Sequence, residues 1–265
     1  MVWSVGGELI RRVRHLLAER YHVRGGRGAL PSVSHLLGVR TDWPSVTLVG
    51  EPRSSTGMDS QGRHGILMRG IGRWIVYSRP RAWLGMTVEI PSLLRGIDLP
   101  RGAVCLDIAA GLGWASAGVA RRHPSAQIVS LDYDETILPR TREYLSAHGA
   151  AANPALCQAD AKRLPFRSGA FDLVVCLYGL HHVCGYSEGL REIARVLKPT
   201  GGFALIDPIR KSGKSPGGHH GTEVLTHEEL DRMLREAGFE TVMFRESLGR
   251  VKAVARKAKS VTLAG

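Results

Sequence analysis

The stretch Ala103–Ala115 constrains the fold more than any other, because it joins a strand pattern to a helix pattern through a turn of small residues. An apolar run leads into one acid, Asp107, and the turn AAGLG follows at residues 109–113. Small side chains let such a turn bring its backbone close to a ligand at the carboxyl end of the first strand of an open α/β sheet. The same turn also occurs where a helix simply packs tightly on a strand, so its meaning depends on the residues that follow.

Three later strand patterns end in residues suited to a ligand site. The strand expected over Gln127–Tyr133 carries Asp132, about 20 residues after the turn, which is the spacing of a carboxylate that accepts the hydroxyl groups of a ribose. The pattern Ala155–Asp160 also ends in an acid. The long apolar pattern Ala170–Tyr178 is followed by the sequence GLHH at residues 179–182. The four strand ends therefore have the order and spacing of a single ligand site.

From residue 103 onward, strand and helix patterns alternate. This alternation predicts a doubly wound α/β fold with a mostly parallel sheet and helices on both faces. The expected helices cover residues 114–122, 135–147, 186–197 and 226–238, the last opening with the capping-box spacing of Thr226 and Glu229. The expected closing strands cover residues 203–208, 241–247 and 251–256. We divide the chain into a helical and irregular N-terminal extension, residues 1–98, and an α/β domain, residues 99–265.

These motifs resemble the class I S-adenosylmethionine-dependent methyltransferases, in particular the small-molecule branch with the ubiquinone and menaquinone methyltransferases. The resemblance runs from about Ala103 to Lys257 and implies a Rossmann-like, seven-stranded sheet whose last strand is antiparallel. Dinucleotide-binding enzymes usually hold a pyrophosphate with G-x-G-x-x-G, and the third position of that pattern is not met after Gly113. S-adenosylmethionine has no phosphate and carries a sulfonium cation, so carboxylates near the turn favour it electrostatically.

The resemblance also implies which residues bind the cofactor, S-adenosylmethionine. Asp107 and the turn would contact its methionine end, and Asp132 its ribose hydroxyl groups. Asp160 and Ala161 would meet the adenine amino group. The full expected set is Asp107, Ala109, Ala110, Gly111, Gly113, Asp132, Tyr133, Asp160, Ala161 and Tyr178. The family's motif usually has glycine at position 109, so the methyl group of Ala109 would crowd the methionine end.

Methyl transfer requires the acceptor to be held in line with the methyl group, water to be excluded and, for some acceptors, a proton to be removed. His181 and His182 follow the fourth strand pattern, and a histidine is suited to accept a phenol or hydroxyl proton near neutrality. In members of the family, a histidine at this place also packs under the cofactor. Asp207 ends the fifth strand pattern and is expected to face the substrate.

The extension is less informative. Residues 8–21 have a helical stripe of apolar positions, whereas 41–64 is rich in Ser, Gly, Pro and Thr and predicts a long irregular loop. In the family, helices before the first strand commonly form a lid over the substrate; the alternative is that they only cover the sheet. We expect Trp74, Tyr77 and Trp83 to contact substrate. An interface for a homodimer or a partner protein is a further role for this extension.

The net charge of +12 and the pI near 10.1 invite a nucleic-acid partner. However, the basic residues are scattered, and no lysine precedes Lys162. The fourth strand pattern ends in YGLH rather than in the Asn/Asp-Pro-Pro-Tyr/Phe of adenine or glutamine methylation. We therefore expect methyl transfer to O, N or C of a small-molecule metabolite. One alternative is a methyltransferase-like protein that catalyses another reaction or completes a partner's site, and a second is an RNA methyltransferase.

Three features of the sequence bear on cellular location and metal binding: the length of apolar runs, the first residues of the chain, and the spacing of cysteines and histidines. No apolar run approaches the ~20 residues that span a bilayer, and the start lacks the basic-then-apolar order of a signal peptide, so we expect a cytoplasmic protein. Without a C-x-x-C pair, the cysteines are expected to be free and mostly buried rather than zinc ligands. They are Cys105, Cys157, Cys176 and Cys184. His219 and His220 have no third ligand nearby, and we expect no metal.

Overall fold

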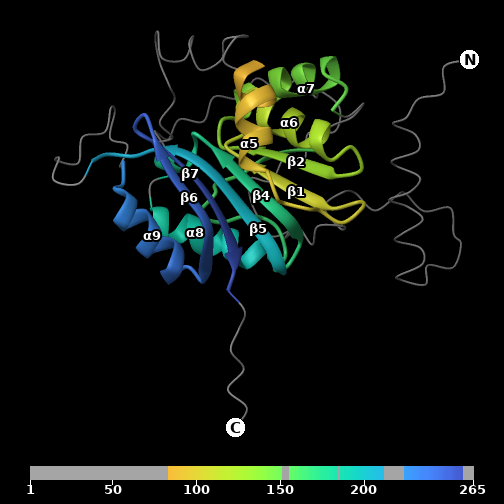
Figure 1. Ribbon diagram of the computed structural model, residues 1–265. Helices are drawn as coiled ribbons and strands as arrows, with labels where there is room; N and C mark the ends of the chain where they lie inside the picture. The colour runs from red at the N-terminus through yellow and green to blue at the C-terminus, as the bar shows by residue number, and fades with distance from the viewer. Residues whose placement is uncertain (1–82, 151–154, 184, 212–223, 259–265) are drawn as a thin grey trace, which may run out of the picture.

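The apolar runs form one seven-stranded sheet in the computed structural model, which describes residues 83–150, 155–183, 185–211 and 224–258 (Figure 1). The strands are β1 (Val104–Ile108), β2 (Gln127–Asp132), β3 (Ala155–Gln158), β4 (Phe171–Leu177), β5 (Leu197–Pro208), β6 (Phe239–Ser247) and β7 (Arg250–Lys257). Their order is β3-β2-β1-β4-β5-β7-β6, and β7 pairs antiparallel with both of its neighbours. The mostly parallel, doubly wound sheet is confirmed.

Each connection between parallel strands returns the chain from the carboxyl end of one strand to the amino end of the next, usually through a helix. These helices cover both faces of the sheet. The helical elements are η1 (Gly85–Glu89), α5 (Ile90–Leu93), α6 (Trp114–Arg122), η2 (Glu135–Ile137), α7 (Leu138–Ala147), η3 (Leu180–His182), α8 (Tyr186–Val196) and α9 (His227–Glu236). Figure 1 shows α5, α6 and α7 on one face and α8 and α9 on the other. The carboxyl ends of β1, β2, β4 and β5 consequently share one edge, where the start of β7 joins them.

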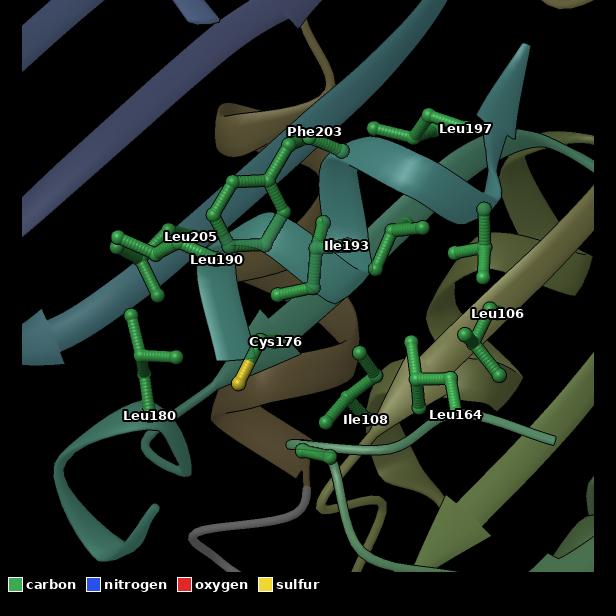
Figure 2. Close-up of a cluster of buried hydrophobic side chains, with 14 of the residues drawn as sticks. Leu106, Ile108, Leu164, Cys176, Leu180, Leu190, Ile193, Leu197, Phe203 and Leu205 are labelled. Carbon is green, nitrogen blue, oxygen red and sulfur yellow. The ribbon is translucent and has the colours of Figure 1, made fainter. Parts of the chain in front are cut away.

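Each face has its own apolar core. On the α8 side, Leu190 and Ile193 of the helix gather with Phe203 and Leu205 of β5 around Cys176 (Figure 2), and all of these side chains are buried. Burying one such leucine stabilises the fold by about 1.5–3 kcal/mol. The buried free thiols of Cys105, Cys157 and Cys176 confirm that interpretation of the cysteines, whereas Cys184 lies outside the described residues.

On the opposite face, the helical turns before β1 pack directly on α6. Gly85 lies against the indole of Trp114, because a Cβ added at Gly85 would be 2.2 Å from the ring. Gly118 is similarly close to Ile90, at 2.9 Å from an added Cβ. Residues 83–94 are therefore part of the same packed body as the sheet, although they belong to the extension that we assigned to residues 1–98.

Three element boundaries differ from expectation. β5 begins at Leu197 rather than at 203, because Leu197 already pairs with Phe171 before the chain bulges and pairing resumes at Gly202. The helix expected over 135–147 divides into η2 and α7, with a proline in the first turn of α7. The sequence also predicts a helical pattern over residues 81–97 that Pro91 interrupts. The helical run is instead continuous from residue 83 to 93, and the Ile90 N–H donates to Gly85 O in the wider π-type turn before the proline.

Other expectations fall on residues that the structure does not describe. These are the helical stripe at 8–21, the loop at 41–64, and Trp74, Tyr77, His219 and His220. Within the described ranges, no helix is both long and apolar enough to cross a membrane.

Candidate functional site

The turn between β1 and α6 has the backbone that its small residues were expected to permit. Ala109, Gly111 and Gly113 all have positive φ, at 55°, 54° and 83°. The Ala110 N–H donates to Leu131 O of the neighbouring strand at 3.0 Å, and Thr141 Oγ1 donates to Gly111 O at 2.5 Å. A Cβ at Gly113 would lie 2.9 Å from Thr141 Cγ2, so glycine is needed there for both conformation and space. Ala109 takes the left-handed region despite its Cβ.

Asp107, at the end of β1, faces into the protein. Its Oδ2 accepts hydrogen bonds from the Ser116 N–H at 2.9 Å and from Ser116 Oγ at 2.6 Å, while Ser116 Oγ also lies 2.7 Å from Ser130 Oγ. Burial raises the pKa of Asp107 from 3.8 to about 7, with a smaller contribution from the negative charge of Asp132. Ser116, which no sequence motif pointed to, lies in the first turn of α6 and holds the carboxylate against the sheet.

Asp132, at the end of β2, holds the turn directly. Its Oδ2 accepts the Gly111 N–H at 2.9 Å, and its Oδ1 accepts the Asp134 N–H at 2.9 Å. Burial raises the pKa of Asp132, and these backbone donors oppose the rise. The Tyr133 N–H is a third backbone donor to this carboxylate. Since a carboxylate has about four lone-pair positions, some capacity remains for a further donor.

The residues expected around the adenine lie at the ends of β2 and β3. Tyr133 follows Asp132 and is 45% exposed. Asp160 Oδ1 accepts the Lys162 N–H at 2.9 Å, and Lys162 Nζ lies 3.6 Å from Asp160 Oδ2. Ala161 is buried. The strand-end acid therefore shapes the turn after β3, as Asp132 does after β2.

Tyr178, just after β4, belongs to a polar cluster that the sequence did not reveal. Its hydroxyl donates to Glu89 Oε1 at 2.8 Å and accepts from Arg250 Nη1 at 2.8 Å, and the guanidinium also lies 3.1 Å from Glu89 Oε1. The hydrogen bond to Tyr178 raises the pKa of Arg250. These residues come from η1, the end of β4 and the start of β7, so no local pattern could have connected them.

His181 and Asp207 form a close pair across the ends of β4 and β5. His181 Nδ1 lies 2.8 Å from Asp207 Oδ1, and the His181 N–H donates to Asp207 Oδ2 at 2.9 Å. The hydroxyl of Tyr186 is a further donor to Asp207. Burial raises the pKa of this carboxyl, which is 2% exposed. Both residues were expected to line the site from the sequence, but their contact was not expected.

The second histidine has a different environment. The rings of His181 and His182 are 3.9 Å apart, and burial, followed by the neighbouring His181, lowers the pKa of His182 from 6.5 to about 4. Its Nδ1 is buried and has no hydrogen-bond partner among the described residues. His182 is therefore neutral near neutral pH.

The strand-end acids converge on one place in the sheet. The pKa of the Cys176 thiol, in β4, is raised well above its ordinary value, first by burial and then by the charges of Asp207, Asp107 and Asp132. Ala109 and Gly179 connect the turn to the histidines, since a Cβ at Gly179 would lie 2.4 Å from the Ala109 Cβ. In contrast, Trp83 is 62% exposed. Among the described side chains, no group of three or more potential metal ligands occurs.

Comparison with known proteins agrees with this architecture. Residues 105–201 match a family model described as a methyltransferase domain. The chain is 34% identical over 135 residues to the ubiquinone/menaquinone biosynthesis C-methyltransferase UbiE of Pseudomonas entomophila, covering 51% of this chain and 50% of that protein. It is 37% identical over 122 residues to UbiE of Ectopseudomonas oleovorans, covering 46% and 68%. The chain thus spans about half the length of the first of these relatives.

Solved structures share the fold at lower identity. The [4+2]-cyclase SpnF superposes with a TM-score of 0.59 at 20% identity, covering 64% of this chain and 81% of that protein. A SAM-dependent methyltransferase from Aquifex aeolicus gives 0.56 at 19% identity, covering 66% and 93%. The strand order, the glycine turn and the matched relatives lead to one conclusion: the chain belongs to the class I S-adenosylmethionine-dependent methyltransferases.

Proposed function

We propose that this protein binds S-adenosylmethionine at the β1–α6 turn and transfers its methyl group to a small-molecule acceptor. The observation that carries the proposal is the position of Asp132. Its carboxylate holds the turn through the Gly111 N–H at 2.9 Å and retains acceptor capacity for a ribose hydroxyl group. The turn does not complete the phosphate-binding pattern G-x-G-x-x-G, which agrees with a cofactor that has no phosphate.

The residues fit the chemistry of this cofactor, which supplies a methyl group on a cationic sulfur. Asp107 and Asp132 place negative charge beside the turn, and a nearby cation favours the ionised form of a carboxyl whose pKa burial has raised. Gly111 and Gly113 adopt their positive φ without strain because they have no Cβ, and the turn can therefore present its backbone to a ligand. Tyr133, Asp160 and Ala161 would surround the adenine at the ends of β2 and β3.

The small-molecule acceptor is inferred from the relatives and from the site. The relatives are named for C-methylation in ubiquinone and menaquinone biosynthesis. Buried and half-buried side chains at the edge between β4 and β5, namely His181, His182 and Asp207, would face an acceptor that is held next to the methyl group. The scattered basic residues give no continuous track for RNA in the sequence.

Calorimetric titration tests the cofactor assignment. Wild-type protein should bind S-adenosylmethionine and S-adenosylhomocysteine, and Asp132→Asn should weaken both by about 10–100-fold, the cost of hydrogen bonds to a charged group. Asp231→Asn on α9 is the matched control, because it also removes one carboxylate but lies on the outer helix. Absence of binding by the wild type, or unchanged affinity in Asp132→Asn, would refute the proposal.

One observation favours a second candidate, a methyltransferase-like protein with another activity. The Ala109 methyl group occupies a position where the family usually has glycine. This candidate predicts that the cofactor binds but that no methyl group leaves it with any acceptor. Mass-spectrometric detection of a methylated product would exclude it.

A further inference from the structure

We infer that His181 is the general base of the reaction, that Asp207 positions it, and that the acceptor is consequently a phenolic or enolic hydroxyl compound. The inference rests on the proposed function. It selects one of two adjacent histidines and assigns a role to a buried carboxylate that lies outside the cofactor-binding turn.

Asp207 holds His181 through two separate contacts. Asp207 Oδ1 lies 2.8 Å from His181 Nδ1, and Asp207 Oδ2 accepts the His181 backbone N–H at 2.9 Å. One carboxylate therefore restrains both the ring and the main chain of the same residue. The Tyr186 hydroxyl, which also donates to Asp207, restrains the carboxylate in turn.

This arrangement determines which ring nitrogen can accept a proton. A carboxylate offers only lone pairs, so Nδ1 carries the hydrogen and donates it to Asp207. The lone pair of His181 then lies on Nε2, on the opposite side of the ring. The carboxylate also stabilises the positive charge that the ring acquires when it takes a proton, as in other histidine–carboxylate pairs.

His182 lacks these features. It has no carboxylate partner among the described residues, and its Nδ1 is buried without any hydrogen-bond partner there. Its ring lies 3.9 Å from that of His181. A neutral ring in this position avoids repulsion when His181 becomes charged. His182 is therefore a packing neighbour of the base.

His181 and Asp207 lie at the carboxyl ends of the strands, on the same edge of the sheet as the cofactor turn. Asp207 ends β5, His181 follows β4, and the two strands are adjacent, with Leu177 paired to Ile206. Gly179 lies between His181 and the cofactor turn, against Ala109. His181 is 14% exposed at its side chain, so a small acceptor can reach it while bulk water is largely excluded.

His181 Nε2 takes the hydroxyl proton of the acceptor, and the electron pair left on the acceptor would form the new bond to the methyl carbon, from oxygen or from the conjugated ring carbon. Where the ring carbon is methylated, its hydrogen leaves as a proton and the oxygen regains one, so either product releases one proton in total. S-adenosylmethionine would supply the methyl group, and the pair of the broken carbon–sulfur bond would stay on its sulfur, which would become neutral. The imidazolium then returns its proton to water. An acceptor that is already anionic would not need His181.

Two measurements test the inference on the full chain. The first needs no substrate: nitrogen-15 NMR of histidine-labelled protein should show neutral His181 protonated at Nδ1, and Asp207→Asn should abolish that preference. A wild-type Nε2–H tautomer would overturn the inference. Titration with S-adenosylhomocysteine should give unchanged affinity in His181→Asn and Asp207→Asn, which separates this test from failure of the cofactor proposal.

The second measurement compares acceptors. With a series from unsubstituted phenol to nitrophenols that are already ionised, His181→Asn should lower kcat for phenol at least about 100-fold, the usual contribution of a general base, with little change in KM. The loss should shrink toward the ionised acceptors, and Asp207→Asn should follow the same trend. His227→Asn on α9 is the control and should leave rates unchanged. Equal losses for all acceptors, or methylation of no phenol by a wild type that binds the cofactor, would overturn the inference.

Discussion

The methyl group of Ala109 lies so close to Gly179 that a Cβ added at Gly179 would be 2.4 Å from it. Ala109 directly follows β1 and begins the cofactor turn, and Gly179 lies two residues after β4, the neighbouring strand, just before the histidines. An alanine at the first position of the turn is therefore accommodated by a glycine on the adjacent strand end. This relationship makes the departure from the family's glycine testable.

Gly179→Ala should destabilise the fold by about 1–3 kcal/mol, the usual cost of overpacking, because the two methyl groups cannot both fit. Ala109→Gly should suppress much of that cost when the two changes are combined. Alone, Ala109→Gly should change stability by less than about 1 kcal/mol, since relief of the left-handed backbone offsets the greater entropy of the unfolded chain.

Urea denaturation of the single and double variants measures this coupling. Gly202→Ala is the matched control, because its added Cβ would meet its nearest neighbour at an ordinary 3.8 Å. Strict additivity of the Gly179 and Ala109 changes would contradict the proposed contact.

Asp107 should make the stability of the cofactor-free protein depend on pH. Its pKa is about 7 in the folded protein against 3.8 for an unperturbed group, so the folded state holds the proton more tightly. Its contribution to stability is complete below about pH 4 and is lost as the pH rises through 7. Relative to Asp107→Asn, the wild type should therefore lose on the order of a few kcal/mol across this window.

Denaturation curves at several pH values across that window test the expectation, and parallel curves for wild type and Asp107→Asn would contradict it. The two cofactor forms provide an independent check. S-adenosylmethionine, whose sulfonium favours ionised carboxyls, should gain affinity with rising pH more than S-adenosylhomocysteine does, and this difference should shrink in Asp107→Asn.

The cluster of Glu89, Tyr178 and Arg250 should contribute to stability well beyond a surface ion pair. Glu89 is 5% exposed, and Arg250→Met would leave its carboxylate without the guanidinium. We expect a loss of about 2–3 kcal/mol, below the ~3–5 for a fully buried pair because Arg250 is partly exposed. Tyr178→Phe should cost about 1 kcal/mol, the value of one hydrogen bond.

The control is Arg232→Met, which removes an arginine 3.9 Å from Glu236 on the exposed face of α9 and should change stability by less than about 0.5 kcal/mol. Chemical denaturation of the three variants gives the comparison. A loss for Arg250→Met as small as that for Arg232→Met would show that the cluster is not an energetic link between η1 and the sheet.

Local sequence determined most of the fold of residues 103–257. The apolar runs predicted the strands, and the small residues at 109–113 predicted the turn that follows the first of them. The capping box of Thr226 and Glu229 is present at the start of α9. Each of these features is set by residues that are close in sequence, because strand patterns, turns and helix caps depend on local backbone conformation and on neighbouring side chains.

The tertiary structure alone decided how the site is assembled. Asp207 contacts His181 across 26 positions of sequence, and Arg250 contacts Glu89 across 161. No periodicity reports such pairs, because side chains meet only after the strands have taken their order in the sheet. For the same reason, the sequence named two histidines with equal weight. Packing distinguished them, because it gave a buried carboxylate to His181 and left the buried Nδ1 of His182 without a hydrogen-bond partner among the described residues.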